Sequence, residues 1–195
     1  ANDGNQPIPT WQAPSSLDVG VLDLCGKTME SISGINLPQR LDDDDDYLDT
    51  GEGDPEGEGR VVRDKCDWEF TPMASGVDPW GLTLEYESFI TESEGKSVLE
   101  LSADAYSQEK MEVDDWFGEI DGTGTEGVSG DSKYFYGESK EGDAGQYAIV
   151  GKVKGSVYVI RIEDKGEFAS KELFWNELEP VVDRIVLNLE RWTPS

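Results

Sequence analysis

The chain has 195 residues, of which 43 are acidic, 16 are basic and none is histidine, so its formal net charge is −27. This charge excludes nucleic acid as a partner, because no basic surface is left to displace counterions from phosphates, and it disfavours direct adhesion to an anionic membrane. The lack of histidine excludes Ser-His, Cys-His and His-metal mechanisms.

The first 16 residues have the composition of a linker. Segment 1–16 contains three prolines and a single charged side chain, so it is expected to be extended and unable to bury a core. We interpret it as a flexible spacer left after removal of a signal or anchor, followed by one folded domain over 17–195. The alternative interpretation is that the sequence simply begins some residues before its folded domain.

Helical spacing appears directly after the linker. Leu17, Val21, Leu24 and Cys25 recur at that spacing, and 27–33 predicts a short helix that ends at Gly34.

Cys25 and Cys66 are the only two cysteines. An even count with no other metal-ligand pattern favours a disulfide, which indicates an oxidising compartment. The bridge would close a loop of about 40 residues and contribute roughly 4 kcal/mol of stability. Two unconnected buried thiols are the alternative, and a catalytic thiol would lack a histidine to lower its pKa.

The segment 41–59 is an acidic loop with ten carboxylates and no cation. Its repelling charges and its glycines predict a mobile excursion. An EF-hand register starting at Asp42 or at Glu52 fails at the glycine or glutamate position that calcium binding needs. Dense carboxylates still attract hard cations, which leaves a weak Ca²⁺ site as the metal candidate, with the ligands Asp42, Asp44, Asp46 and Asp49.

Two strands are predicted after the acidic loop. Over 61–70, Val62, Cys66, Trp68 and Phe70 fall on one face, with Asp64 as the exception at the strand's wetter end. The segment 81–91 alternates in the same way. Next, 96–111 reads as a helix or as a strand turning helical, and we favour the helix. Trp116, Phe117 and Ile120 then form an isolated apolar cluster, and 121–131 reads as a loop.

The last third of the chain has the clearest patterns. Strands are predicted over 133–136, 146–153 and 156–163, the last two joined as a hairpin at Lys154-Gly155. An amphipathic helix follows from an N-cap at Ser170 to about residue 191, with Pro180 inside it as a kink or as a joint between two pieces.

The order of elements predicts an α+β domain, an antiparallel sheet with helices, including the long C-terminal one, packed on one face. The other face carries Glu85, Glu87 and Lys152, so we expect it to be wet or covered only in part.

No catalytic group stands out. Carboxylate pairs are unavoidable in so acidic a chain, and the Ser-Lys neighbours at 96–97 and 170–171 read as surface residues. Aromatic residues beside the loops are the better indication of a binding site, because their convergence would form an apolar groove for a lipid, a glycan or a partner protein. A second small core is the alternative for these residues: Trp80, Trp116, Phe117, Tyr134 and Tyr136.

Several of these patterns together resemble the small cell-envelope lipoproteins of actinobacteria. They are Leu24-Cys25 before a short helix, Cys66-Asp67-Trp68 on a strand, the strand sequence VYVIRI and the C-terminal amphipathic helix, spread over 17–189. The resemblance implies a PsbP/Mog1-like α+β sandwich on the extracellular face of the cell membrane, held by a lipidated cysteine ahead of Ala1. It also implies a role in assembling or trafficking mycolate envelope components.

The leading hypothesis is a non-enzymatic envelope lipoprotein domain, without a cofactor, that binds an envelope protein or a lipid or glycolipid. Its only membrane contact would be the anchor. A salt-adapted secreted protein is one alternative, although ten lysines against six arginines argue against strict salt adaptation. A divalent-cation binder using 42–58 is the other.

Overall fold

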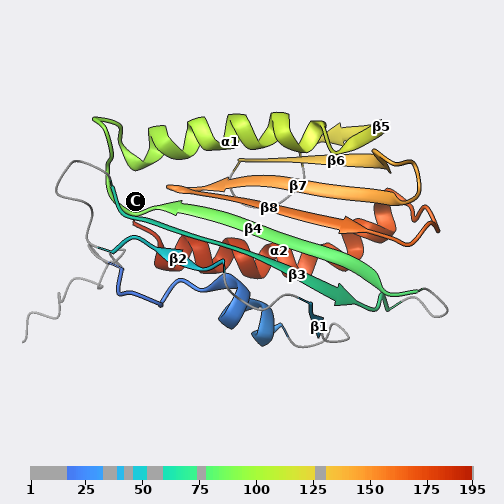
Figure 1. Cartoon of the computed structure of the whole chain (residues 1–195), viewed down its shortest axis with the longest axis horizontal. Helices are drawn as coiled ribbons and strands as arrows, with labels where there is room; N and C mark the ends of the chain where they lie inside the picture. Colours follow the sequence, from blue (N-terminus) through green and yellow to red (C-terminus); the bar gives the residue numbers. More distant parts are fainter. Residues whose placement is uncertain are drawn as a thin grey trace, which may run out of the picture.

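The computed structural model describes residues 17–32, 39–41, 46–51, 59–73, 78–125 and 131–194. The predicted linker 1–16 and most of the predicted acidic loop lie outside these residues. The described part contains one 8-stranded antiparallel sheet in the order β1-β3-β4-β8-β7-β6-β5, with β2 also paired to β3 (Figure 1). The strands are β1 (Gln39–Arg40), β2 (Leu48–Asp49), β3 (Val61–Phe70), β4 (Trp80–Phe89), β5 (Phe117–Gly124), β6 (Asp131–Ser139), β7 (Gly145–Val153) and β8 (Ser156–Glu163). The helical elements are η1 (Leu24–Thr28), η2 (Met29–Ser31), α1 (Val98–Asp114) and α2 (Lys171–Trp192).

The predicted strands over 61–70 and 81–91 are confirmed as β3 and β4. They pair along their full length, from Val61 opposite Phe89 to Phe70 opposite Trp80. Their alternating burial follows from the two-residue period of a strand. Asp64 does not lie at a wet end, because it is only 3% exposed and accepts a hydrogen bond from the Lys65 backbone N–H at 2.8 Å.

The predicted C-terminal helix is confirmed as α2. It begins after Ser170, whose hydroxyl accepts a hydrogen bond from the Leu173 N–H at 3.2 Å. We predicted that Pro180 either kinks this helix or separates two helical segments. The separation does not occur, since α2 continues from Lys171 to Trp192. The buried stripe of α2 packs on one face of the sheet through Phe174, Leu178, Val181, Val182, Ile185, Val186 and Leu189.

The N-terminal segment packs on the same face as α2. Where we predicted helix over 17–33, the structure has one π-helical turn, η1, and one 3-10 turn, η2. The predicted disulfide is present between Cys25 of η1 and Cys66 of β3, and both cysteines are fully buried. The Leu24 N–H also donates to the Tyr86 hydroxyl at 3.3 Å. The bridge therefore holds a segment with little regular structure against the sheet, and a buried disulfide indicates an oxidising compartment.

The predicted helix over 96–111 is confirmed as α1, but it packs on the opposite face of the sheet. Neighbouring residues of β8 show this, because Val157 and Val159 pack with α1 whereas Tyr158 and Ile160 pack with the α2 core. The expectation that all helices share one face is therefore wrong. The physical reason is that β7 and β8 are apolar on both sides, and a sheet buried on both faces needs a cover on each.

β5 is a strand that we predicted as an apolar cluster followed by a loop. It pairs only with β6 and has register irregularities after Phe117 and after Ile120. Five of its residues, 118–121 and Thr123, are exposed, so the hydrophobic alternation that marks a half-buried strand is missing. Pairing needs a close backbone approach here, since a Cβ on Gly137 of β6 would lie 2.0 Å from the Glu119 carbonyl oxygen.

One buried carboxylate shapes the connection from β8 to α2. Asp164 is 3% exposed and accepts hydrogen bonds from the backbone N–H groups of Gly145 at 2.9 Å, Gly166 at 3.1 Å and Ala169 at 2.6 Å. The side chain thus satisfies one donor at the start of β7 and two in the loop between β8 and α2, which lacks a regular ladder.

Replacing Asp164 with alanine is expected to lower the free energy of unfolding by about 2 kcal/mol, because three backbone N–H groups, of which that of Gly145 is buried, lose their acceptor. Urea denaturation followed by tryptophan fluorescence measures the change. Glu167→Ala is the matched control, since Glu167 is exposed in the same loop. Equal losses in the two variants would contradict the assigned role of Asp164.

Candidate functional site

The five aromatic residues predicted to bind a ligand do not come together. Trp80 is fully buried, with its ring 4.8 Å from that of Phe174 of α2. Tyr134 and Tyr136 are half-buried and pack against the same core, and the Tyr136 hydroxyl donates to the Ala169 carbonyl at 2.9 Å. These three residues therefore belong to the α2 side of the sheet.

The other two predicted residues lie on the α1 side. Phe117 is 8% exposed and stacks on Phe135, while Trp116 is half-buried with the Arg161 guanidinium 5.0 Å from its ring. The sheet thus separates the five side chains into two sets, and the expectation of one exposed aromatic groove is wrong. They add to the two cores, in line with the alternative interpretation.

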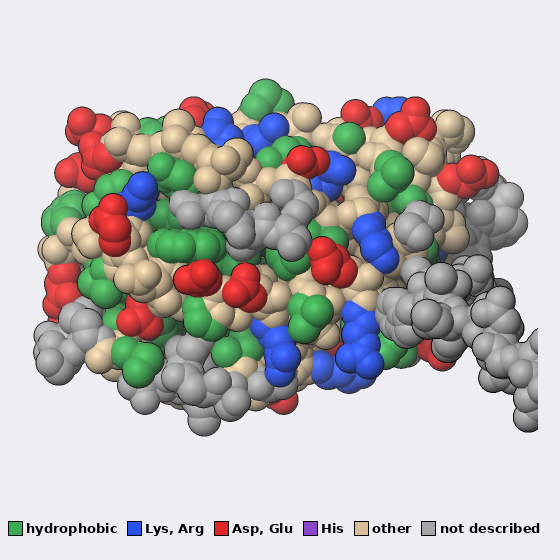
Figure 2. Space-filling model, turned by 180° about the vertical axis from the view of Figure 1, so that it is seen from behind, with side chains coloured by type: hydrophobic (Ala, Val, Ile, Leu, Met, Phe, Trp, Pro, Cys, Tyr) green, Lys and Arg blue, Asp and Glu red, His purple; other side chains and the backbone are tan. Residues whose placement is uncertain are grey.

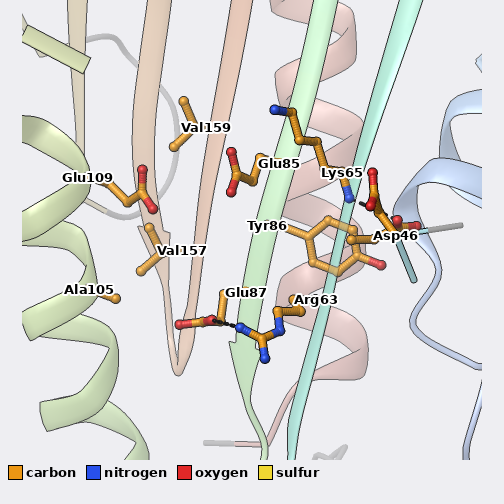
Figure 3. Close-up of a pocket in the computed structure, with 11 residues that line it drawn as sticks. Asp46, Arg63, Lys65, Glu85, Tyr86, Glu87, Ala105, Glu109, Val157 and Val159 are labelled. Carbon is orange, nitrogen blue, oxygen red and sulfur yellow. Dashed lines mark hydrogen bonds and ion pairs between the residues drawn. The ribbon is translucent and has the colours of Figure 1, made fainter. Parts of the chain in front are cut away.

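A different groove lies between α1 and the outer part of the sheet. Its volume is about 420 Å³, and Figure 3 shows the Glu109 and Glu85 side chains extending into the space between α1 and β4. Most of its lining side chains are of three kinds, the acidic Asp46, Asp64, Glu85, Glu87 and Glu109, the basic Arg63 and Lys65, and the apolar Ala105, Val157 and Val159, and Tyr86 also lines it.

The local structure explains why these side chains meet. Ala105 and Glu109 are four residues apart, so they lie on one face of α1. Glu85 and Glu87 are two residues apart on β4, as are Val157 and Val159 on β8, which places each pair on one face of its strand. Because α1 covers only part of this face, the valines form a floor and the charged side chains of β3 and β4 remain open beside it (Figure 3).

The groove changes the protonation of its carboxyl groups. Burial, together with the charges of Glu85, Glu112 and Glu87, raises the pKa of Glu109 to about 7. Burial and Glu85 also raise the pKa of Glu87, while Arg63 lowers it. The Arg63 Nη1 and Glu87 Oε2 atoms are 3.8 Å apart. Glu109 therefore holds a proton part of the time near neutral pH, at the edge of an apolar floor.

The four residues of the calcium candidate do not form a site among the described residues. Asp42 and Asp44 lie outside the described residues, and Asp46 is at the edge of the groove. Asp49 does not serve as a ligand, because both of its carboxylate oxygens accept hydrogen bonds from Arg60 at 2.9 Å. Within the described ranges no three acidic or cysteine side chains are grouped closely enough to hold a metal ion.

No family model, no curated protein and no solved structure matches the chain. Among the described helices, none combines the length and the apolar character required to cross a bilayer.

Replacing Glu109 with glutamine is expected to raise the free energy of unfolding by about 1 kcal/mol at pH 8 and to leave it unchanged at pH 4. The pKa of Glu109 is raised in the folded state from an ordinary value of 4.5 to about 7. The folded chain thus binds the extra proton between these values, so stability falls as pH rises from 4.5 to 7 and then levels off. The side chain stays half-exposed, and solvent screening keeps the effect small.

Urea denaturation at several pH values measures how the free energy of unfolding changes with pH. Glu179→Gln is the control, because Glu179 is exposed on α2 and the substitution removes the same charge. A Glu109→Gln profile parallel to that of Glu179→Gln would show that the groove does not perturb Glu109.

Proposed function

We propose that this chain is a non-enzymatic, extracytoplasmic domain of an actinobacterial envelope lipoprotein that binds a partner protein in the groove between α1 and β4. The observation that carries the proposal is the groove itself, which combines an apolar floor with charged side chains on both sides. Such a combination is typical of protein-binding surfaces, where an apolar centre is surrounded by a polar rim.

The groove favours a protein over a lipid as the ligand. Its apolar part is small, consisting mainly of Val157, Val159 and Ala105, and seven charged side chains line the same groove. An acyl chain would remove these charges from water without pairing them, which is costly. A protein segment can supply both apolar contacts and opposite charges.

The compartment and the fold family are parts of the same proposal. The buried Cys25–Cys66 bridge supports a position outside the cytoplasm. A helix on each face of an antiparallel sheet supports a PsbP/Mog1-like sandwich. The accessory role in mycolate envelope assembly comes from the resemblance to envelope lipoproteins. Metabolic labelling of the full-length gene product with an alkyne fatty acid tests the anchor, and an unlabelled product would contradict it.

Filling the groove tests the binding function. Ala105→Trp places a large side chain at the groove, whereas Ala103→Trp places it at an exposed position of the same helix. Native gel electrophoresis of solubilised envelopes should show a larger complex that persists in Ala103→Trp and is lost in Ala105→Trp. The double variant Glu85→Lys/Glu87→Lys should lose it too, which guards against a packing defect in α1. A complex that survives both changes, or a co-purified lipid in place of a protein, would contradict the proposal.

A further inference from the structure

We propose that the groove binds a basic, apolar-containing segment of the partner protein by exchanging the proton held at Glu109 for a lysine ammonium or arginine guanidinium of that segment. This inference rests on the proposed function, because it specifies what the groove binds and how binding depends on pH.

Charge complementarity identifies the occupant. Glu85 and Glu87 on β4 and Glu109 on α1 place three carboxyl groups beside the valine floor. Arg63 and Lys65 stand across the groove on β3, where Arg63 lies 3.8 Å from Glu87. The acidic groups outnumber the basic ones, so a cationic side chain finds carboxylates while its aliphatic stem lies on the floor. The net charge of −27 also attracts a basic segment from a distance.

The surroundings of Glu109 explain the coupling to a proton. Glu85 and Glu87 face it from β4, Glu112 follows one turn later on α1, and β8 contributes only valines. Crowded like charges and burial favour the neutral acid, and the arriving cation favours the carboxylate. On binding, the Glu109 O–H bond breaks, its proton passes to the buffer and the carboxylate pairs with the cation. No oxidant or reductant takes part.

Isothermal titration calorimetry on the full chain tests the exchange. The probe is the hexapeptide Ac-(Lys-Val)₃-NH₂, and Ac-(Lys-Ser)₃-NH₂ has the same charge without apolar side chains. The first peptide should bind about tenfold more tightly at pH 8 than at pH 6, the ratio expected when one group with a pKa of about 7 must lose its proton on binding. Titrations at pH 7 in phosphate and in Tris should show release of about half a proton, because Glu109 is then about half-protonated. The serine peptide should bind more weakly.

Two double variants distinguish binding in the groove from a general attraction of the basic peptide to an acidic protein. Glu85→Gln/Glu109→Gln removes two charges from the groove, and Glu179→Gln/Glu190→Gln removes two from exposed positions of α2. α2 passes behind the strands in Figure 1, and Figure 2 shows that acidic, basic and hydrophobic side chains are interspersed on that side. The groove variant should lose the pH dependence and about tenfold in affinity, and the α2 variant should keep both.

The outcomes distinguish this inference from the proposed function. Equal affinities in the two double variants, or binding without proton release, would overturn the exchange at Glu109. If Ala105→Trp still abolishes the envelope complex in that case, the groove remains the binding site. If Ala105→Trp leaves the complex intact, the proposed function fails as well.

Discussion

Replacing Cys25 and Cys66 together with alanine is expected to lower the free energy of unfolding by about 4 kcal/mol, a large part of the stability of a domain of this size. The two cysteines are 41 residues apart in sequence, and the bridge restricts this loop in the unfolded chain. In the folded chain it fixes η1, whose five residues form a single turn, against β3. Without the bridge, little regular hydrogen bonding holds this segment to the sheet.

Urea denaturation of the double variant measures the loss. Val19→Ala is the control, because Val19 lies in the same N-terminal segment and is 71% exposed. Wild-type protein unfolded in the presence of dithiothreitol should approach the midpoint of the double variant. A loss below about 1 kcal/mol would show that the unfolded chain is not restricted as a loop of this length predicts.

Replacing Asp49 with alanine is expected to lower the free energy of unfolding by about 3 to 5 kcal/mol, because Arg60 would remain buried without its partner. The two side chains are only 3% and 7% exposed, and both oxygens of Asp49 accept hydrogen bonds from Arg60. Arg60 also donates to the Leu17 carbonyl. This cluster therefore joins the start of the described chain, β2 and the residue before β3.

The Asp49–Arg60 pair also predicts how the stability of the protein changes at acidic pH. Hydrogen bonds from Arg60 lower the pKa of Asp49 below its ordinary value of 3.8. A carboxyl group with a lowered pKa contributes stability above the pKa of the unfolded chain, and this contribution is lost as pH falls through the folded value. Wild-type and Asp49→Ala proteins should thus converge in stability in acid and differ most at neutral pH.

Two further variants identify the cause of the loss. Asp131→Ala removes an exposed carboxylate 3.6 Å from Lys152 and should cost less than about 1 kcal/mol. Asp49→Ala/Arg60→Met should recover part of the stability lost in Asp49→Ala, because the double variant leaves no unpaired buried charge. A double variant as unstable as the sum of the two single changes would argue that each side chain acts independently.

The elements that could be predicted from the sequence have strong local patterns. The alternation over 61–70, the turn at Lys154-Gly155 and the apolar stripe of the C-terminal helix each specify their own structure. β5 has no such pattern, because an edge strand can form by pairing with β6 while most of its side chains stay exposed. The face on which α1 packs depends on the second apolar face of β7 and β8. This face forms only when the strands pair into the sheet.

The groove could not be predicted for a related reason. Glu109 is one of 43 acidic residues, and nothing adjacent to it in sequence distinguishes it. Its environment arises because α1 lies beside β4 and above Val157 and Val159. Trp80 shows the converse, since its place beside a loop indicated exposure while the sheet and α2 bury it completely. The segment 41–59 could not be interpreted correctly either, because the partner of Asp49 is Arg60, the residue that directly follows this segment.

Site-specific photo-crosslinking in the native envelope tests partner binding at the groove most directly. A photoreactive amino acid at position 105 lies in the groove, and one at position 187 replaces a leucine that is 52% exposed on α2. We expect a single protein to be crosslinked from position 105 and not from position 187, through a peptide that contains lysine or arginine beside apolar residues. Equal crosslinking from both positions, or crosslinking from position 187 alone, would contradict a partner-binding groove between α1 and β4.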